Sequence, residues 1–306
     1  MSAPRRIKLN INGVLLLDKP YGISSNGALQ KARWLYSAAK AGHTGVLDPL
    51  ATGLLPVCFG EATKFSSYLL DADKGYRATV RFGAVTTTGD IEGEVVLTRP
   101  VAFDRAALEQ AIVAHTGPIS QVPPMYSALK HQGKALYEYA REGIEIAREP
   151  RDVTIHRIEL VSFDGDSAVI DVLCSKGTYI RTLAQDIGEM LGCGAHLTGL
   201  RRTTTGGFRL DDALTLEAIE VLPTTERGAL LLPVDVLVGH FPAATLAASE
   251  AVRFCHGQAV HALEKCETML RFRVYHADTQ EFLGLADATP QGLLQPVRVM
   301  AAQAAN

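Results

Sequence analysis

The stretch GHTGVLDPLATG, residues 42–53, decides how this sequence is interpreted. It holds three glycines, one proline and a single carboxylate, Asp48. Glycine adopts backbone angles that other residues resist, and Asp-Pro favours a turn, so the stretch predicts a tight loop. Apolar runs border the loop on both sides. A loop between buried elements, with one ionisable acid at its centre, is typical of a catalytic group presented by a rigid scaffold.

Asp48 also has a simpler interpretation. Asp before Pro is common in ordinary turns, where the carboxylate accepts hydrogen bonds from nearby backbone amides. The loop differs from an exposed linker because it is dense in glycine and lacks Ser, Asn and Lys. The pattern therefore favours a well-defined loop, but it does not name a reaction.

The bulk properties are those of a globular protein of 306 residues, with 47% hydrophobic and 21% charged residues. This length suits one large domain with or without a small one. No run approaches the roughly 18 apolar residues of a membrane helix, and no signal peptide is evident. Five widely spaced cysteines without a Cys-x-x-Cys pair argue against a disulfide framework and against zinc. We expect a cytoplasmic protein.

The charge is unevenly distributed along the chain. Residues 211–250 contain seven acids and one base, a net charge of −6, which leaves +3 on the rest of a chain whose total is −3. A basic face outside the acidic segment is therefore compatible with the composition. Composition permits RNA binding without demonstrating it.

Hydrophobic periodicity and capping residues predict the elements of an α+β fold. The expected strands are 13–17, 54–59, 75–82, 94–97, 153–163, 168–174 and 196–208. The expected helices are one capped by Ser24 or Ser25 and running to 36, one at 61–70, one capped by Asp104, one capped by Thr178, helical packing after 212, and one at 249–256. Three alternating runs after about residue 245 predict a small β-rich module.

The segment 121–151 mixes aromatic and basic side chains, which suits phosphate contacts combined with stacking on unpaired bases. These side chains are Tyr126, Tyr137, Tyr139, Lys130, Lys134, Arg141, Arg148 and Arg151. Four glutamates nearly balance the charge, so an amphipathic helix with a solvated face is an equal alternative on pattern alone.

Two other kinds of site find no support. A metal site needs convergent ligands, and Cys255, His256, His261 and Cys266 lack convincing spacing. A nucleotide-dependent enzyme needs a phosphate loop such as GxxxxGK[ST] or GxGxxG, and neither is present. A lone carboxylate that works without cofactor or metal is the remaining interpretation.

Motifs along nearly the whole chain resemble the TruB family of pseudouridine synthases. In the order of that family they are GVLLLDKPYGISS (13–25), GHTGVLDPLATGLLPVCFGEATK (42–64), DKGYRATVRFGAVTTTGDIEG (73–93), QVPPMYSALKHQGKALYEYAREG (121–143) and SKGTYIRTLAQDIGEMLGCGAHLTGLRRTTTGGF (175–208). Val46 is a departure, at a position where the family usually has Thr. Asp48 itself is retained.

The resemblance implies a mixed, largely antiparallel central sheet flanked by helices in residues 1–245, with an RNA-gripping insertion at about 120–150. It implies a small β-rich, PUA-like RNA-binding domain in residues 246–306. The implied reaction isomerises uridine to pseudouridine at position 55, in the T-arm loop of transfer RNA, by base flipping. No cofactor, metal, guide RNA, membrane or obligatory protein partner is implied, and the enzyme is expected to be a monomer.

The resemblance also assigns the catalytic roles. Asp48 is implied to be the nucleophile, which attacks uracil C6 or ribose C1′ or assists loss of the C2′ proton. Arg181 is the expected bidentate partner that keeps Asp48 ionised. Tyr76 is implied to stack on the uracil and to handle the C5 proton, whereas periodicity alone makes it a core aromatic residue.

Four further residues are expected to bind the substrate. Tyr179 and Leu200 match family positions that line the nucleotide pocket. His43 would occupy the space vacated by the extruded base; as a lone histidine it would be a structural loop residue. Lys19 is a further substrate-binding candidate that could meet a phosphate, although its position at a strand end favours a structural role.

The sequence is compatible with two rival functions. One is a guide-RNA-dependent, dyskerin-like pseudouridine synthase, which usually carries a larger RNA domain and basic extensions. The other is an RNA-binding or tRNA-folding protein in which Asp48 is idle.

Overall fold

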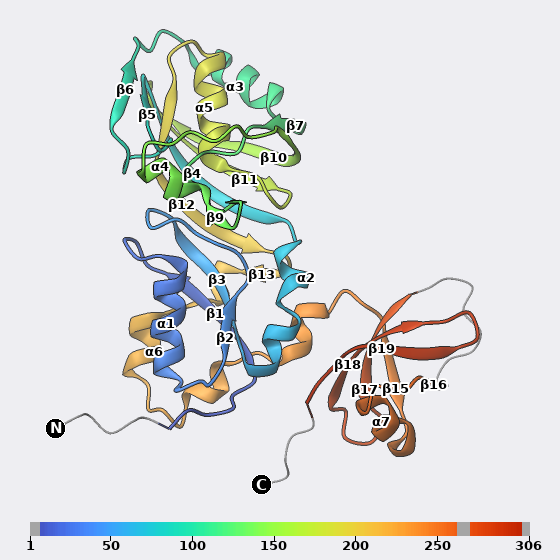
Figure 1. Cartoon of the computed structure of the whole chain (residues 1–306). Helices are drawn as coiled ribbons and strands as arrows, with labels where there is room; N and C mark the ends of the chain where they lie inside the picture. The colour runs from blue at the N-terminus through green and yellow to red at the C-terminus, as the bar shows by residue number, and fades with distance from the viewer. Residues whose placement is uncertain (1–6, 262–269, 302–306) are drawn as a thin grey trace, which may run out of the picture.

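A ten-stranded sheet dominates the computed structural model, which describes residues 7–261 and 270–301 (Figure 1). In spatial order its strands are β14 (Leu214–Thr215), β1 (Gly13–Lys19), β3 (Thr52–Phe59), β12 (Ala195–Thr205), β4 (Lys74–Phe82), β11 (Ser167–Cys174), β10 (Arg151–Phe163) and β7 (Gly117–Gln121), with β2 (Ala41–His43) beside β3 and β13 (Phe208–Arg209) beside β12. Two of the described strand pairs, β1–β14 and β3–β12, are parallel and seven are antiparallel. The expected mixed, largely antiparallel sheet is confirmed.

Strand β1 is buried on both faces, which explains its unbroken apolar run. Leu15 and Leu17 belong to a core shared with the helices on one face, and Val14 and Leu16 belong to a second core on the other. Successive strand residues point to opposite faces, so both faces need apolar side chains. Burial of each Leu contributes about 1.5–3 kcal/mol.

Helices α1 (Ser25–Leu35) and α3 (Arg105–Ala114) begin where their capping residues predict. Ser24 Oγ and Asp104 Oδ1 each accept a hydrogen bond from the amide three residues on, at 3.0 and 2.9 Å. None of the helices in the described residues is long and apolar enough to cross a membrane.

Helix α5 (Ile180–Met190) has a different cap from the one expected. Tyr179 is its N-cap residue, without a side-chain capping bond. The Thr178 hydroxyl instead donates to the carbonyl of Ser175 at 2.9 Å, which ties the preceding turn together. The prediction of a Thr178 cap was therefore wrong, because the hydroxyl is engaged one turn earlier.

The helix expected at 61–70 is broken into two parts. A 3-10 helix, η1 (Gly60–Lys64), precedes the short helix α2 (Ser66–Leu70), and Phe65 lies between them. Phe65 is fully buried in the second core. The helix is therefore interrupted at the residue whose ring enters the core.

The segment 121–151 is not the long amphipathic helix weighed as an alternative. It contains a two-residue hairpin, β8 (Lys130–His131) with β9 (Lys134–Ala135), and one short helix, α4 (Leu136–Arg141), within irregular chain. Further described elements are the pair β5 (Ala84–Thr86) and β6 (Val95–Thr98), α6 (Leu216–Val221), η2 (Leu210–Asp212), η3 (Arg227–Leu230) and η4 (Val234–Val238).

A five-stranded sheet with one helix forms the C-terminal part of the molecule (Figure 1). Its order is β15 (Ala243–Leu246), β17 (Arg271–His276), β18 (Phe282–Ala288), β19 (Leu293–Val299) and β16 (Val260–His261), and the helix is α7 (Ala248–Cys255). Strand β15 straddles the expected boundary at 245 and 246 and belongs with this sheet. The β-rich module is confirmed, while its assignment as a separate RNA-binding domain stays a prediction.

Candidate active site

The Asp48 loop is anchored by the segment that precedes α1. Ser25 Oγ accepts from the amide of Leu47 at 2.7 Å and donates to the Leu47 carbonyl at 2.9 Å. The amide of Gly22 donates to the carbonyl of Pro49 at 2.9 Å. The two residues that flank Asp48 are therefore fixed, and the carboxylate projects from a held backbone.

Lys19 is buried rather than exposed to a substrate. Its ammonium donates to the carbonyls of Pro20 at 2.8 Å, Ile23 at 2.6 Å and Pro49 at 3.5 Å, and the residue is 0% exposed. Burial lowers the pKa of Lys19 to about 8, although nearby Asp48 opposes the change. The expectation that Lys19 contacts the substrate is not met, because its side chain ties the N-terminal segment to the Asp48 loop.

Gly53 closes the loop where no other residue fits. Its φ is +99°, and a Cβ at this position would lie 2.3 Å from the carbonyl oxygen of Arg202. Gly53 is also the Cα partner of Arg202 where β3 and β12 run in parallel. The glycine thus allows the loop to pass directly into the sheet beside β12.

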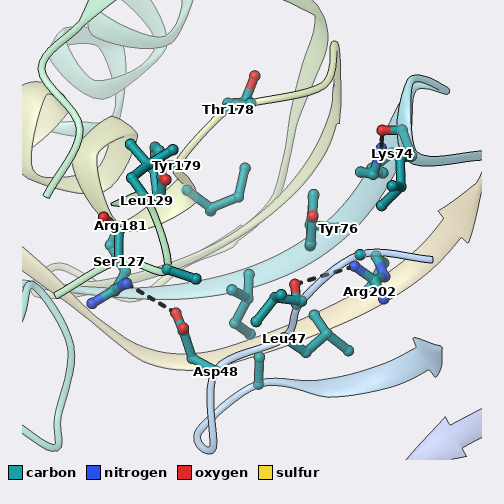
Figure 2. Close-up of a pocket in the computed structure, with 18 residues that line it drawn as sticks. Leu47, Asp48, Lys74, Tyr76, Ser127, Leu129, Thr178, Tyr179, Arg181 and Arg202 are labelled. Carbon is teal, nitrogen blue, oxygen red and sulfur yellow. Dashed lines mark hydrogen bonds and ion pairs between the residues drawn. The ribbon is translucent and has the colours of Figure 1, made fainter. Parts of the chain in front are cut away.

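Arg181 forms the predicted ion pair with Asp48, but with one contact instead of two. Arg181 Nη2 lies 3.0 Å from Asp48 Oδ2 (Figure 2). The same nitrogen donates to the carbonyl of Tyr126 at 2.6 Å, and Nη1 donates to the carbonyl of Thr88 at 2.8 Å. Nη1 also lies 3.6 Å from Asp90 Oδ2. The guanidinium therefore bridges two carboxylates, and the expected bidentate pair was wrong.

Asp90 is a further residue beside Asp48 that local sequence patterns do not indicate. It is 2% exposed, and its Oδ1 accepts from the Thr88 hydroxyl at 2.6 Å and from the amide of Glu92 at 3.1 Å. By its sequence, TTTGDIEG at 86–93 predicts only a turn between two strands. A carboxylate beside several threonines in a tight turn was the available signal, but its partner Arg181 is distant in sequence.

The surroundings of Asp48 act on its pKa in opposite directions. Burial raises the pKa of Asp48 above its ordinary value, and the charge of Asp90 adds to the rise. Arg181 and Lys19 oppose it. Of these residues Asp48 is the accessible one, because its side chain is 37% exposed whereas that of Arg181 is 6% exposed. A half-buried carboxylate of this kind is a stronger base and nucleophile than an ordinary surface Asp.

Two cavities adjoin the Asp48–Arg181 pair and share it as a common wall. The first, which we call the tyrosine cavity, has a volume of about 410 Å³ and is lined by Tyr76, Tyr179 and Leu200 among others (Figure 2). The second, the polar cavity, has a volume of about 600 Å³ and is lined by residues that include His43, Asn26, Thr88, Asp90, Glu92 and Arg141. Val46, the departure from the family pattern, is 56% exposed and lines both.

Tyr76 is a core residue, as periodicity predicts, and its role toward the uracil stays a prediction. The residue is only 8% exposed and belongs to the main core, yet it lines the tyrosine cavity opposite Asp48 (Figure 2). Burial raises the pKa of Tyr76, and the Arg202 guanidinium opposes the rise. Tyr179 and Leu200 line the same cavity, so these three expected residues are brought together around Asp48.

His43 lies on the other side of the Asp48 loop. It ends β2 and lines the polar cavity. Burial and, to a smaller extent, the charge of Arg202 lower the pKa of His43 below its ordinary value of 6.5, so the imidazole is neutral at pH 7. The structure places this ring near Asp48 but outside the group around Tyr76.

The neighbouring residues Arg201 and Arg202 point to opposite faces of the sheet. Arg201 pairs with Asp18 at 2.6 and 3.1 Å, away from the tyrosine cavity. Arg202 is 1% exposed and lines the cavity. The sequence showed two adjacent arginines but did not reveal that one lies beneath the site.

The described residues contain no group of three or more His, Cys, Asp or Glu side chains placed to hold a metal ion. Of the four residues considered for such a site, Cys266 lies outside the part of the chain that the structure describes.

Solved structures share this fold over most of the chain. A crystal structure of a Cbf5-Nop10-Gar1 complex superposes with a TM-score of 0.71 and 25% identity, covering 94% of this chain and 85% of that one. An H/ACA RNP bound to a substrate RNA containing 2′-deoxyuridine gives a TM-score of 0.70 at 23% identity, covering 94% of this chain and 84% of that one.

Sequence comparison identifies the class of enzyme. Three family models match the chain: the N-terminal domain of TruB family pseudouridylate synthases over residues 33–180, the tRNA pseudouridylate synthase B C-terminal domain over 181–239, and the C-terminal part of pseudouridine synthase II TruB over 242–300. Fold, loop carboxylate and sequence therefore define a pseudouridine synthase.

Close relatives narrow the class to one family. The tRNA pseudouridine synthase B of Chromobacterium violaceum is 68% identical over 99% of both chains. The enzyme of the same name from Methylobacillus flagellatus is 57% identical over 97% of both. The chain belongs to the TruB family of pseudouridine synthases, and the resemblance noted from its motifs is confirmed.

Proposed function

We propose that this chain is a stand-alone tRNA pseudouridine synthase that isomerises uridine 55 in the T-arm loop, with Asp48 as the nucleophile. The name shared by its relatives, tRNA pseudouridine synthase B, supports the substrate class. The observation that carries the mechanism is the Asp48–Arg181 pair, 3.0 Å apart, in the wall of a cavity lined by Tyr76.

The reaction needs no external reagent. The bond between ribose C1′ and uracil N1 breaks, the base turns, and C5 joins C1′. C5 loses its proton and N1 gains one, so atoms and electrons balance without oxidant, reductant or cofactor. Attack by Asp48 at C1′ would form a covalent intermediate like that of a retaining glycosidase. Addition to uracil C6 and removal of the C2′ proton are alternative first steps.

The tyrosine cavity suits an extruded uracil. Tyr76 offers its ring as a stacking surface and its hydroxyl as a group for the C5 proton, while Tyr179 and Leu200 supply further contacts. Extrusion of a base typically costs a few kcal/mol, which such contacts offset. His43, which lines the polar cavity, would fill the space that the base leaves.

The RNA outside the active site would be held by two regions. The segment 121–151 contributes Arg141 and Tyr137 to the polar cavity, with the guanidinium 5.3 Å from the ring centre. The C-terminal sheet supplies a second surface. A protein that carries both would recognise a folded tRNA arm by shape, phosphates and extruded bases, as a monomer without a guide RNA.

An Asp48→Asn variant tests the nucleophile. We expect release of tritium from 5-tritiated uridine in tRNA to fall by at least about 10⁴-fold, because the amide cannot form the ester or accept the proton. Asp171→Asn is the matched control, since Asp171 pairs with Arg77 on the opposite face of the sheet. Unchanged release from Asp48→Asn would contradict the mechanism.

An assay that contains only the purified protein and its RNA substrate tests the guide-dependent alternative. Purified protein and an unmodified T-arm stem-loop should yield pseudouridine with no other component. Activity that requires a second RNA or protein would favour the guide-dependent enzyme. If wild type and Asp48→Asn assist tRNA folding equally, RNA folding is a second activity, independent of the reaction.

A further inference from the structure

Arg202 is a buried cation that lines the tyrosine cavity, and one of its guanidinium nitrogens has no hydrogen-bond partner in the described part of the chain. Its Nε donates to the carbonyl of Leu54 at 2.7 Å, and Nη1 donates to the carbonyl of Val46 at 3.5 Å. Nη2 is buried and has no hydrogen-bond partner among the described residues. Arg202 is also the Cα partner of Tyr76 across β12 and β4, so both side chains belong to the cavity face of the sheet (Figure 2).

Another buried arginine in this chain has a hydrogen-bond partner for each of its guanidinium nitrogens. Arg227 is 8% exposed, and its Nε, Nη1 and Nη2 donate to the carbonyls of Leu222, Leu35 and Glu220 at 3.1, 2.6 and 2.9 Å. All three of its nitrogens are therefore partnered. Arg202 is more deeply buried, at 1% exposed, and yet leaves Nη2 without a protein acceptor.

Arg202 also lacks an acidic partner. Within residues 7–261 and 270–301, Asp48 and Asp90 pair with Arg181, Asp18 pairs with Arg201, and no carboxylate lies within 4 Å of the Arg202 guanidinium. A buried charge without a counter-charge costs several kcal/mol. An anion that forms in the adjoining cavity would offset part of this cost.

The other cations that line the cavity are already occupied. Both Nη atoms of Arg181 are held by backbone carbonyls and carboxylates. Lys74 Nζ is held by the carbonyls of Leu70 at 2.9 Å and Ala72 at 2.5 Å. Arg202 is thus the guanidinium that lines the cavity and still has a nitrogen unpartnered by the described residues.

We propose that Arg202 is a further catalytic residue, whose Nη2 donates to a uracil carbonyl oxygen and stabilises the negative charge that the base acquires during the reaction. This inference rests on the proposed function. It does not depend on the first step. If C1′–N1 breaks, its electron pair leaves with N1 and the charge spreads to O2 and O4. If Asp48 adds to C6, the electron pair of the C5–C6 double bond forms an enolate at O4.

A donor fixed in a water-poor site stabilises such an oxyanion more strongly than water does. The energetic cost of holding the guanidinium has already been met by folding, so little reorganisation is needed when the charge develops. Tyr76 and Arg202 then have separate roles: the phenol handles the C5 proton, and the guanidinium faces the carbonyl oxygen.

The test compares Arg202→Lys and Arg202→Gln with wild type on two T-arm stem-loops, one with uridine and one with 5-fluorouridine at the target. Single-turnover rates are measured as loss of the N-linked nucleoside, by digestion and mass spectrometry, together with the Kd for each RNA. Fluorine withdraws electrons and stabilises the uracil anion by itself. The ratio of the two rates is independent of the fraction of protein that is folded.

We expect Arg202→Gln to lower the rate on uridine by about 100-fold and the rate on 5-fluorouridine by about 10-fold or less, with Kd within about threefold of wild type. Arg202→Lys should lie between Gln and wild type. The matched controls, Arg227→Lys and Arg227→Gln, remove a buried guanidinium elsewhere and should leave the ratio unchanged.

Equal losses on the two substrates, or a loss confined to Kd, would overturn the role of Arg202. A ratio that shifts equally in the Arg227 variants would overturn it too. These outcomes are distinguishable from failure of the proposed function, in which wild type itself forms no pseudouridine.

Discussion

The tyrosine cavity and the polar cavity share Asp48, Arg181 and the residues beside them but differ in the rest of their linings. The first is lined by aromatic rings, aliphatic side chains and a buried guanidinium. The second is larger and carries amide, hydroxyl and carboxylate groups together with Arg141. The rings and the buried guanidinium of the first suit a flat base and a developing charge, whereas the hydrogen-bonding groups and Arg141 of the second suit an RNA backbone. The comparison teaches that changes on the tyrosine side should alter the rate, and changes on the polar side the affinity.

Among the substitutions that test this comparison, the largest effect is expected for Tyr76→Phe, which removes one hydroxyl from the tyrosine cavity. The rate of tritium release should fall by about 10²–10⁴-fold, because a general acid–base group contributes that much, while the Kd for the T-arm stays within about threefold. Single-turnover kinetics and filter binding measure the two quantities. Tyr36→Phe is the control, since this buried hydroxyl donates to the carbonyl of Arg227 at 3.0 Å, in another region. A weaker Kd at an unchanged rate would reverse the assignment of the cavities.

A second, smaller effect is expected for Arg181→Lys, in the wall that the cavities share. The rate should fall by about 100-fold, because one ammonium cannot reach both carboxylates and the carbonyls of Thr88 and Tyr126. Circular dichroism should show a folded protein. Arg99→Lys, which alters an exposed pair with Glu189, is the control. Near-normal turnover would refute the need for a guanidinium beside Asp48.

Arg141→Ala should affect the polar side alone. We expect the Kd for the T-arm to rise by about tenfold and the slope of log Kd against log salt to decrease by about one, with the rate at saturating RNA unchanged. Arg105→Ala, in an exposed pair with Glu109 on α3, is the matched control. A reduced rate at saturation would show that the two cavities are not separate in function.

The smallest effect is expected on the free energy of unfolding and concerns Lys19. Its ammonium holds the Asp48 loop, which lies between the two cavities. Its pKa is about 8 in the folded protein against an ordinary value of 10.5. Between these values the unfolded chain binds the proton more tightly, so stability from this group rises with pH from 8 to 10.5 and is lost as pH falls through 8.

Urea unfolding of wild type and Lys19→Met at pH 8 and pH 10 measures this contribution. The advantage of wild type over the variant should increase between the two pH values, by at most about 3 kcal/mol. An advantage that stays constant or shrinks would mean that the ammonium remains charged when folded.

Much of the fold followed from local patterns. The glycines around Asp48 predicted the loop, alternation predicted β4, and Ser24 and Asp104 predicted the starts of their helices. The exceptions have tertiary causes. Phe65 breaks the helix at 61–70 because its ring enters a core made by distant segments. The cap of α5 differs because the hydroxyl of Thr178 is used by the turn before it.

The site was only partly predictable. The family motifs brought together Asp48, Arg181 and Tyr76, since these residues lie in distinctive stretches. Asp90 and Arg202 were not identified, because their importance depends on strand pairing: β12 lies beside both β3 and β4. Sequence periodicity can assign a residue to one face of a strand, but it does not reveal which strand lies alongside.

The placement of Arg201 and Arg202 on opposite faces of β12 has a consequence for how this chain can change in length. Deleting one residue within the strand would move Arg201, the partner of Asp18, to the cavity side and carry Arg202 away from it. The two arginines would exchange faces, and each would lie one position away from its present place, so that neither the Asp18 pair nor the alignment with Tyr76 would be kept. By contrast, the exposed turn at 164–166, between β10 and β11, lines neither of the two cavities. Insertions and deletions should therefore be tolerated at this turn and should disrupt the site when they fall within β12.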